Sequence, residues 1–138
     1  MRYVYFFIAA IGLIGCQDKV NQLDLPFLNG YWEIEKVSFP DGTEKKYTVN
    51  TSVDYIEIND LKGYRKKVQP KFNGTYDTSN DAEMFTIYEK DGVFTINYAT
   101  DLSEWHEKIV SLSENSFTVL SGDNLKYQYK RFEPINIE

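Results

Sequence analysis

Gly30 to Phe39, with the sequence GYWEIEKVSF, is the stretch that decides the fold. From Tyr31 to Phe39 it is rich in aromatic and β-branched residues, and this part follows a turn-forming break at 28–30, so it predicts a β-strand. Trp32 and Val37 would fall on opposite faces of a regular strand. We therefore expect a β-bulge near Glu35, in preference to a strand that is covered on both faces.

The last strand provides a partner for Trp32. From Leu125 to Lys130 apolar and polar residues alternate strictly, which predicts a strand whose apolar face lies on the odd positions. Arg131 is the next odd position, and a cation above an indole face stabilises by roughly 0.5–2 kcal/mol. We expect Arg131 to pack on Trp32. The simpler alternative is an ordinary core tryptophan and an arginine that turns to solvent.

These two features together resemble the lipocalin family. In that family a Gly-x-Trp motif, here Gly30 to Trp32, begins the first strand and closes one end of a barrel, and a late arginine, here Arg131, lies across the indole. The resemblance implies an all-β domain, a single antiparallel up-and-down β-barrel of about eight strands, a size that just holds one small ligand. It covers roughly residues 28 to 132, and we assign 28–138 to the domain.

The composition agrees with one β-rich domain. A chain of 138 residues, 42% of them hydrophobic, has enough apolar material for a single core. The 11 tyrosines and 9 phenylalanines favour strands, since flat amphipathic rings suit half-exposed pleated surfaces. No segment has a long helical period, which argues against a βαβ fold. The net charge of −6 argues against nucleic acid as a partner.

The amino terminus has the pattern of a secretion signal. Arg2 precedes an apolar run from Tyr3 to Ile14, which is too short to span a bilayer, so we expect residues 1–15 to be a cleaved signal peptide. The sequence Leu13-Ile14-Gly15-Cys16 resembles the bacterial lipobox. That resemblance implies that Cys16 is acylated and becomes the first residue of the mature protein.

Cys16 is the one cysteine of the chain, so it cannot form an internal disulfide. The alternative to lipidation is a chance cysteine in an ordinary signal peptide. Residues 16–27 lack periodicity and contain Pro26, and we expect them to be a lipidated tether. Several acyl chains anchor a protein stably. We therefore expect an envelope protein that is anchored to the outer membrane, on its periplasmic side or at the cell surface. The polar segment 17–19 resembles the residues that direct some bacterial lipoproteins to the cell surface.

The remaining strands alternate between short and long connections. They are expected at 55–59, 64–76, 83–89, 93–98, 105–112 and 117–120. If neighbouring strands run antiparallel, the tight turns at 60–63, 90–92 and 113–115 lie at the Trp32 end. The connections at 40–54, 77–82, 99–104 and 121–124 then lie at the other end. By the resemblance to the lipocalin family, such a barrel would be closed at the Trp32 end and open at the opposite one.

An open barrel predicts a ligand cavity. Strand 64–76 has the clearest period of two, and its even, more apolar positions are expected to face inward, with a bulge or unpaired stretch at Pro70. The side chains expected to line the cavity are Tyr55 or its neighbour Ile56, Lys66, Phe72, Tyr76, Tyr98, Trp105 and Tyr127. Lys66 would orient an anionic headgroup or pair with an inner acid. The alternative is that these rings fill the barrel and leave no cavity.

Catalytic and metal motifs are not evident. His106 is the one histidine, so neither a common zinc site nor a Ser-His-Asp arrangement has support, and we interpret it as an ordinary strand residue. Two pairs of acids are close in sequence, Glu33 with Glu35 and Glu104 with Glu107, and we interpret them as solvated groups. Asp77, Asp81 and Glu83 lack the spacing of a calcium-binding loop. We expect no metal, no cofactor and no enzymatic activity.

The sequence therefore predicts a monomeric, membrane-anchored binding module for a small hydrophobic or amphiphilic molecule. The alternative is an interaction protein with a filled barrel, whose loops at 40–53 and 77–82 contact another envelope protein. A large cavity lined by aromatic rings would favour the first function, and a filled barrel beneath an exposed apolar rim would favour the second.

Overall fold

The computed structural model describes residues 19–50 and 52–133, so the predicted signal peptide and Cys16 lie outside the described residues. A 3-10 helix, η1 (Gln22–Leu28), precedes ten strands. The strands are β1 (Gly30–Ser38), β2 (Glu44–Lys46), β3 (Val53–Asn59), β4 (Lys62–Pro70), β5 (Tyr76–Thr78), β6 (Glu83–Lys90), β7 (Val93–Ala99), β8 (Glu104–Leu112), β9 (Ser116–Ser121) and β10 (Lys126–Arg131). Within these residues, a helix with the length and apolarity of a membrane span was not found.

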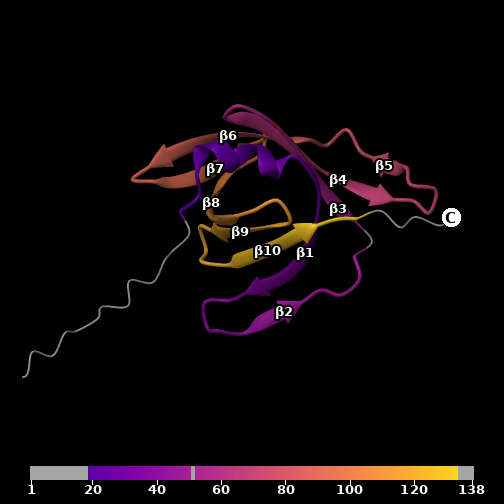
Figure 1. Ribbon diagram of the computed structural model, residues 1–138, viewed down its shortest axis with the longest axis horizontal. Coiled ribbons are helices and arrows are strands. Elements are labelled where there is room, and N and C mark those ends of the chain that lie inside the picture. The colour runs from indigo at the N-terminus through magenta and orange to yellow at the C-terminus, as the bar shows by residue number, and fades with distance from the viewer. Residues whose placement is uncertain (1–18, 51, 134–138) are drawn as a thin grey trace, which may run out of the picture.

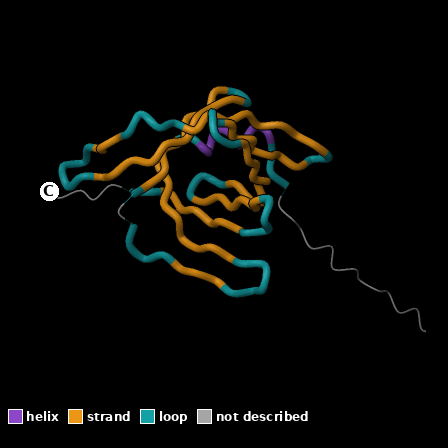
Figure 2. The backbone as a smooth tube through the Cα atoms, turned by 180° about the vertical axis from the view of Figure 1, so that it is seen from behind, coloured by secondary structure: helices purple, strands orange, loops and turns teal. Residues whose placement is uncertain are grey.

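Eight of the strands form a closed antiparallel barrel. The order runs β10-β9-β8-β7-β6-β4-β3-β1, and β1 pairs again with β10. β2 pairs with β1 and β5 pairs with β4, so these short strands form hairpins that project from the barrel in different directions (Figures 1 and 2). The predicted barrel is confirmed. The predicted bulge is also present, between Ile34 and Lys36.

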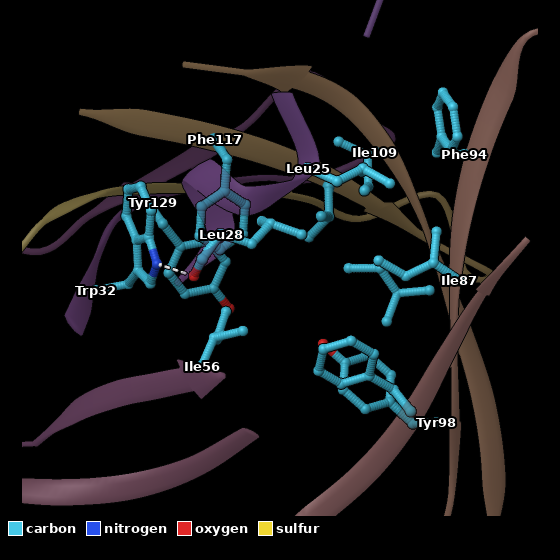
Figure 3. Close-up of a cluster of buried hydrophobic side chains, with 13 residues drawn as sticks. Leu25, Leu28, Trp32, Ile56, Ile87, Phe94, Tyr98, Ile109, Phe117 and Tyr129 are labelled. Atoms are coloured by element: carbon cyan, nitrogen blue, oxygen red, sulfur yellow. Dashed lines mark hydrogen bonds between the residues drawn. The ribbon is translucent and has the colours of Figure 1, made fainter. Parts of the chain in front are cut away.

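Trp32 fills the closed end of the barrel. Its side chain is fully buried, its Nε1 donates a hydrogen bond of 2.8 Å to the carbonyl of Leu28, and its ring meets the edge of Phe117 with centroids 4.7 Å apart. Leu25 and Leu28 of η1 pack into the same cluster (Figure 3). The η1 helix therefore covers the closed end of the barrel. This corrects the prediction of a tether extending to residue 27, because residues 22–27 belong to the packed helix.

Arg131 lies across the outer face of Trp32. Its guanidinium carbon is 3.9 Å from the centroid of an indole ring, and Trp32 and Arg131 are paired residues of β1 and β10. The guanidinium also donates hydrogen bonds to the backbone carbonyls of Phe27, Asn29 and Glu114. Arg131 thereby joins η1, the start of β1 and the β8–β9 turn.

Gly30 leaves the space that Arg131 occupies. Gly30 has a φ of +119°, and a Cβ built on it would lie 2.5 Å from Nη1 of Arg131. We expect Gly30→Ala to lower the free energy of unfolding by about 2–3 kcal/mol, because backbone strain and displacement of the guanidinium add. Urea denaturation measures this loss. Gly42→Ala is the control, since Gly42 has a φ of +90° and no atom within 4 Å of its Cβ position. Equal losses in the two variants would contradict a role for the Arg131 contact.

The inward face of β4 is opposite to the predicted one. Arg65, at an odd position, is buried inside the barrel. After Pro70 the chain reverses direction through a turn, in which the Lys71 N–H donates a hydrogen bond of 2.8 Å to the Thr75 carbonyl. β5 then runs back along β4, with Tyr76 opposite Pro70. The period of two therefore does not continue through the whole of 64–76.

A layer of aromatic rings on the outside of the barrel explains the misleading pattern. Tyr31 stacks on Tyr76 with centroids 4.2 Å apart and meets Tyr55 at 4.9 Å. Beside them, Val53 and Val68 are 1% exposed. The outer face of β3 and β4 thus carries buried valines and stacked tyrosines, while the inner face of β4 carries Arg65. This inverts the usual rule for a half-buried strand.

Candidate ligand-binding site

An open cavity of about 830 Å³ lies at the end of the barrel opposite Trp32. It is bounded by the ends of β3, β4, β6, β7 and β8, by the loop before β6, and by the β9–β10 connection with β10. The lining residues are Asp54, Arg65, Lys66, Lys67, Ser79, Asp81, Glu83, Tyr98, Glu104, Trp105, His106, Glu107, Ser121, Gly122, Asp123, Tyr127 and Tyr129. This is where the sequence predicted the open end. Tyr98 lies well away from Trp32 in the core cluster, as Figure 3 shows.

Arg65 and Asp54 form the base of the cavity. Nη2 of Arg65 lies 2.6 Å from Oδ2 of Asp54, Nη1 donates to the Tyr98 hydroxyl at 3.3 Å, and the guanidinium carbon lies 4.8 Å from the Tyr129 ring centroid. Nζ of Lys67 reaches the other Asp54 oxygen at 3.0 Å. Burial alone would raise the pKa of Asp54, but the charges and hydrogen bonds of Arg65 and Lys67 outweigh it and lower that pKa.

Glu107 is a partly buried residue with one buried carboxylate oxygen that has no partner in the described part of the chain. It shares the inward face of β8 with Trp105 and Ile109, and its Oε2 is inaccessible and has no hydrogen-bond partner among the described residues. Burial raises the pKa of Glu107; the nearby charge of Arg65 partly offsets this, and the carboxylates of Asp54 and Glu83 add to it. The carboxylate of Glu107 is therefore a charged group of the site that no donor of the described residues neutralises.

We expect Glu107→Gln to stabilise the fold at neutral pH by about 1 kcal/mol, because a neutral amide is cheaper to bury than an unpaired carboxylate. The sign follows from linkage. The pKa of Glu107 in the folded protein is raised above its ordinary 4.5, so the protonated carboxyl contributes stability that is fully present below pH 4.5. This contribution is lost as the pH rises through the folded pKa. The gain should vanish near pH 4. Thermal unfolding of the parent, Glu107→Gln and the exposed-site control Glu89→Gln at both pH values measures it, and a loss of stability at pH 7 would contradict the assignment.

Aromatic rings form one side of the cavity. Trp105 stacks on Tyr98 with centroids 5.2 Å apart and ring planes 11° apart. Trp105 is partly exposed, whereas Tyr98 is buried and holds the indole in place. Tyr127 is also partly buried, and its pKa is raised by burial and by the carboxylates of Glu107 and Asp123. Both Trp105 and Tyr127 therefore present ring surface beside acidic groups.

The structure brings together some of the predicted lining residues and separates others. Tyr98, Trp105 and Tyr127 line the cavity as expected. Lys66 borders it, but its ammonium lies 6.0 Å from the ring centroids of Tyr55 and Tyr64, on the outer face of the barrel. Among the described residues it forms no ion pair with an inner acid.

Three predicted lining residues lie outside the cavity. Tyr55 and Tyr76 belong to the outer aromatic layer, since Ile56 and Arg65 occupy the inward positions instead. Phe72 is 82% exposed in the turn between β4 and β5. The physical reason is the reversal after Pro70, which moves Phe72 out of the barrel wall and folds Tyr76 onto Tyr31.

The acids considered from sequence also divide. Glu104 is exposed and accepts a hydrogen bond from Asn97 at 3.0 Å, but Glu107 is not the solvated group we predicted. Glu33 pairs with Lys130 at 3.2 Å, Glu35 accepts from Gln128 at 3.2 Å, and Asp77 pairs with Lys71 at 2.8 Å. His106 is exposed, next to Gly122. Residues 19–50 and 52–133 contain no cluster of three or more histidine, cysteine or acidic side chains suited to a metal ion.

Comparison with models of protein families identifies the family of the domain. The model of a family described as a lipocalin-like domain matches residues 28–119. The chain is also similar to the solved structure of a lipocalin-like protein from Bacteroides uniformis, at 14% identity and a TM-score of 0.48, with 77% of this chain and 99% of that chain covered. No curated protein matches the sequence. Because the family model matches more than half of its residues, the chain belongs to the lipocalin-like domain family.

Proposed function

We propose that the protein is a membrane-anchored envelope lipoprotein that binds a small amphiphilic molecule in the open end of its barrel. The observation that carries this proposal is the cavity of about 830 Å³, which falls in the range of roughly 300–1,000 Å³ typical of small-molecule sites. A lipocalin-like fold suggests ligand binding inside the barrel. Both lines of support point to the same space.

The lining favours an amphiphile over a purely hydrophobic ligand. Trp105 and Tyr127 offer aromatic surface, but charged groups surround them and Glu107 keeps a free acceptor. A wholly apolar ligand would cover that carboxylate without giving it a hydrogen bond, which costs free energy. A ligand with one apolar part and one polar donor suits the cavity better.

Binding, rather than catalysis, fits the arrangement of the acids. An acid–base pair needs two groups that are free to exchange protons with a substrate. Asp54 is held by Arg65 and Lys67 at 2.6 and 3.0 Å, so it is not free to act beside Glu107. We propose a non-enzymatic module that acts as a monomer.

The binding proposal is tested by native mass spectrometry of the full chain carrying Cys16→Ser, purified without added ligand. A small molecule that copurifies and is lost from a Trp105→Ala variant is the expected result. Preparations of the parent that repeatedly carry nothing, and that bind no aromatic amphiphile on titration, would count against a carrier function.

The proposed anchor sets the orientation of the domain. η1 begins at Gln22 and packs on the closed end, so few residues separate it from Cys16, and they reach at most about 20 Å when extended. A lipid on Cys16 would therefore hold the closed end towards the membrane and the cavity away from it.

Cys16→Ser is expected to release the protein from membranes, because a serine carries no thiol for the acyl chains. Fractionation of cells, followed by detection of the protein in the soluble and membrane fractions, measures this. Lys19→Ser is a matched control on the same segment and should leave the protein in the membrane fraction. Equal membrane retention of both variants would refute the anchor.

Exposed apolar side chains on three loops favour one second candidate, docking of an envelope protein. Val49 is 83%, Phe72 82% and Leu102 96% exposed, and they lie on the β2–β3, β4–β5 and β7–β8 connections. A protein partner that is captured by the parent but not by a Phe72→Ser, Leu102→Ser double variant would support it. Retained capture by that variant would exclude these side chains as the contact.

A further inference from the structure

We infer that the polar part of the ligand is a cation, an organic ammonium group held between Glu107 and the rings of Trp105 and Tyr127. This inference rests on the proposed binding function and specifies its ligand class. It is argued from the charges around the cavity, from the unpaired carboxylate, and from the aromatic rings beside it.

The charge around the cavity is strongly acidic. The lining contains six carboxylates, from Asp54, Asp81, Glu83, Glu104, Glu107 and Asp123, and three basic side chains, from Arg65, Lys66 and Lys67. Two of the basic groups are bound to Asp54, and the third points to the outer face. None of the other five carboxylates forms an ion pair within the described part of the chain. Their combined field attracts a cation into the open end.

Glu107 provides the specific negative charge. It lines the cavity, and its Oε2, which solvent does not reach, has no hydrogen-bond donor among the described residues. A carboxylate without a donor is costly to bury, and a positive charge at the cavity surface beside it would offset that cost without touching Oε2. The cavity surface next to Glu107 is therefore suited to an ammonium ion.

The rings of Trp105 and Tyr127 supply the second half of the site. A cation over an aromatic face is stabilised by roughly 0.5–2 kcal/mol, most strongly on tryptophan. Tyr98 supports the indole from one side at a centroid distance of 5.2 Å, which fixes its orientation. A preorganised ring beside an unpaired carboxylate is a common way to bind ammonium groups, and it also accepts an apolar tail.

Two other ligand classes fit less well. An anion would have to compete with Asp54 for Arg65, whose guanidinium is already held by Asp54, Tyr98 and the face of Tyr129. A divalent metal would need several oxygen or nitrogen ligands, and the described residues hold no cluster of three such side chains. An organic cation needs only one carboxylate and an aromatic face.

The test compares three ligands that share one ring and differ in charge. Phenethylamine is a cation, 2-phenylethanol is neutral and 3-phenylpropionate is an anion at pH 7. Isothermal titration calorimetry on the full chain carrying Cys16→Ser should show phenethylamine binding at least tenfold more tightly than 2-phenylethanol, with 3-phenylpropionate weakest. Glu107→Gln should weaken the amine at least tenfold and change the alcohol less than about twofold, while Glu89→Gln, an exposed site on β6, should change neither.

The outcomes separate this inference from the proposed function. Equal or tighter binding of the alcohol or the acid would overturn the cationic ligand but leave a binding cavity in place. An unchanged amine affinity in Glu107→Gln would also overturn it, and thermal unfolding of that variant excludes loss of the fold as a cause. Absence of binding by all three compounds at millimolar concentration would overturn the cationic ligand, and it would overturn the binding function as well if nothing copurifies with the parent.

Discussion

Trp32→Ala is expected to lower the free energy of unfolding by about 3–5 kcal/mol, the usual cost of removing a buried tryptophan. The side chain is 0% exposed, donates a 2.8 Å hydrogen bond to Leu28 and carries Arg131 on its face. Its loss would empty the closed end and also remove the support for η1. Since a domain of this size is stable by only about 5–15 kcal/mol, we expect a large fall in the urea midpoint.

Trp105→Ala is the matched control for this prediction. It removes the same side chain from the open end, where the indole is partly exposed and borders the cavity. We expect a loss of about 1 kcal/mol, because less apolar area leaves solvent on folding. Similar losses for the two tryptophans would contradict the distinction between a filled closed end and an open one.

Asp54→Asn is expected to cost about 3–5 kcal/mol, because it leaves the charge of Arg65 buried without a counterion. The two side chains are 8% and 10% exposed and lie 2.6 Å apart. Asp77→Asn is the control, since Asp77 pairs with Lys71 at 2.8 Å but both side chains are about half exposed or more, and such pairs contribute at most about 1 kcal/mol. Chemical denaturation of both variants measures the difference, and equal effects would contradict it.

The same ion pair predicts an acid limit to stability. The pKa of Asp54 is lowered from its ordinary 3.8, so its contribution is complete above that value and is lost as the pH falls through the folded pKa. In Asp54→Asn this part of the pH dependence should be missing. Glu107 acts in the opposite direction, since its pKa is raised.

The closure of the barrel was predictable because local and global signals agree in β1 and β10. Gly30 provides a backbone conformation, Trp32 a large apolar group and Arg131 a cation in the phase that meets it. The lengths of the connections then distinguished the two ends. Residue type and spacing predict the two strands directly, and the resemblance to the lipocalin family implied that they meet and close the barrel.

The lining of the cavity was only partly predictable, because hydrophobicity does not identify the inner face of β4. Tyr64 and Val68 are apolar but lie outside, beneath or beside the aromatic layer, while Arg65 lies inside because Asp54 of β3 and Tyr98 of β7 receive it. Such partners are distant in sequence. Glu107 was missed for a related reason, although its spacing from Trp105 and Ile109 was a signal for the inner face.

The most direct test of a ligand site at the open end uses the two tryptophans as reporters. Their indole N–H groups lie at opposite ends of the barrel and give two signals in a ¹H–¹⁵N NMR spectrum of the chain, which contains 2 tryptophans. Titration with phenethylamine is expected to shift the Trp105 signal and to leave the Trp32 signal in place. A shift confined to Trp32, or saturable binding that moves neither signal, would contradict a site in this cavity.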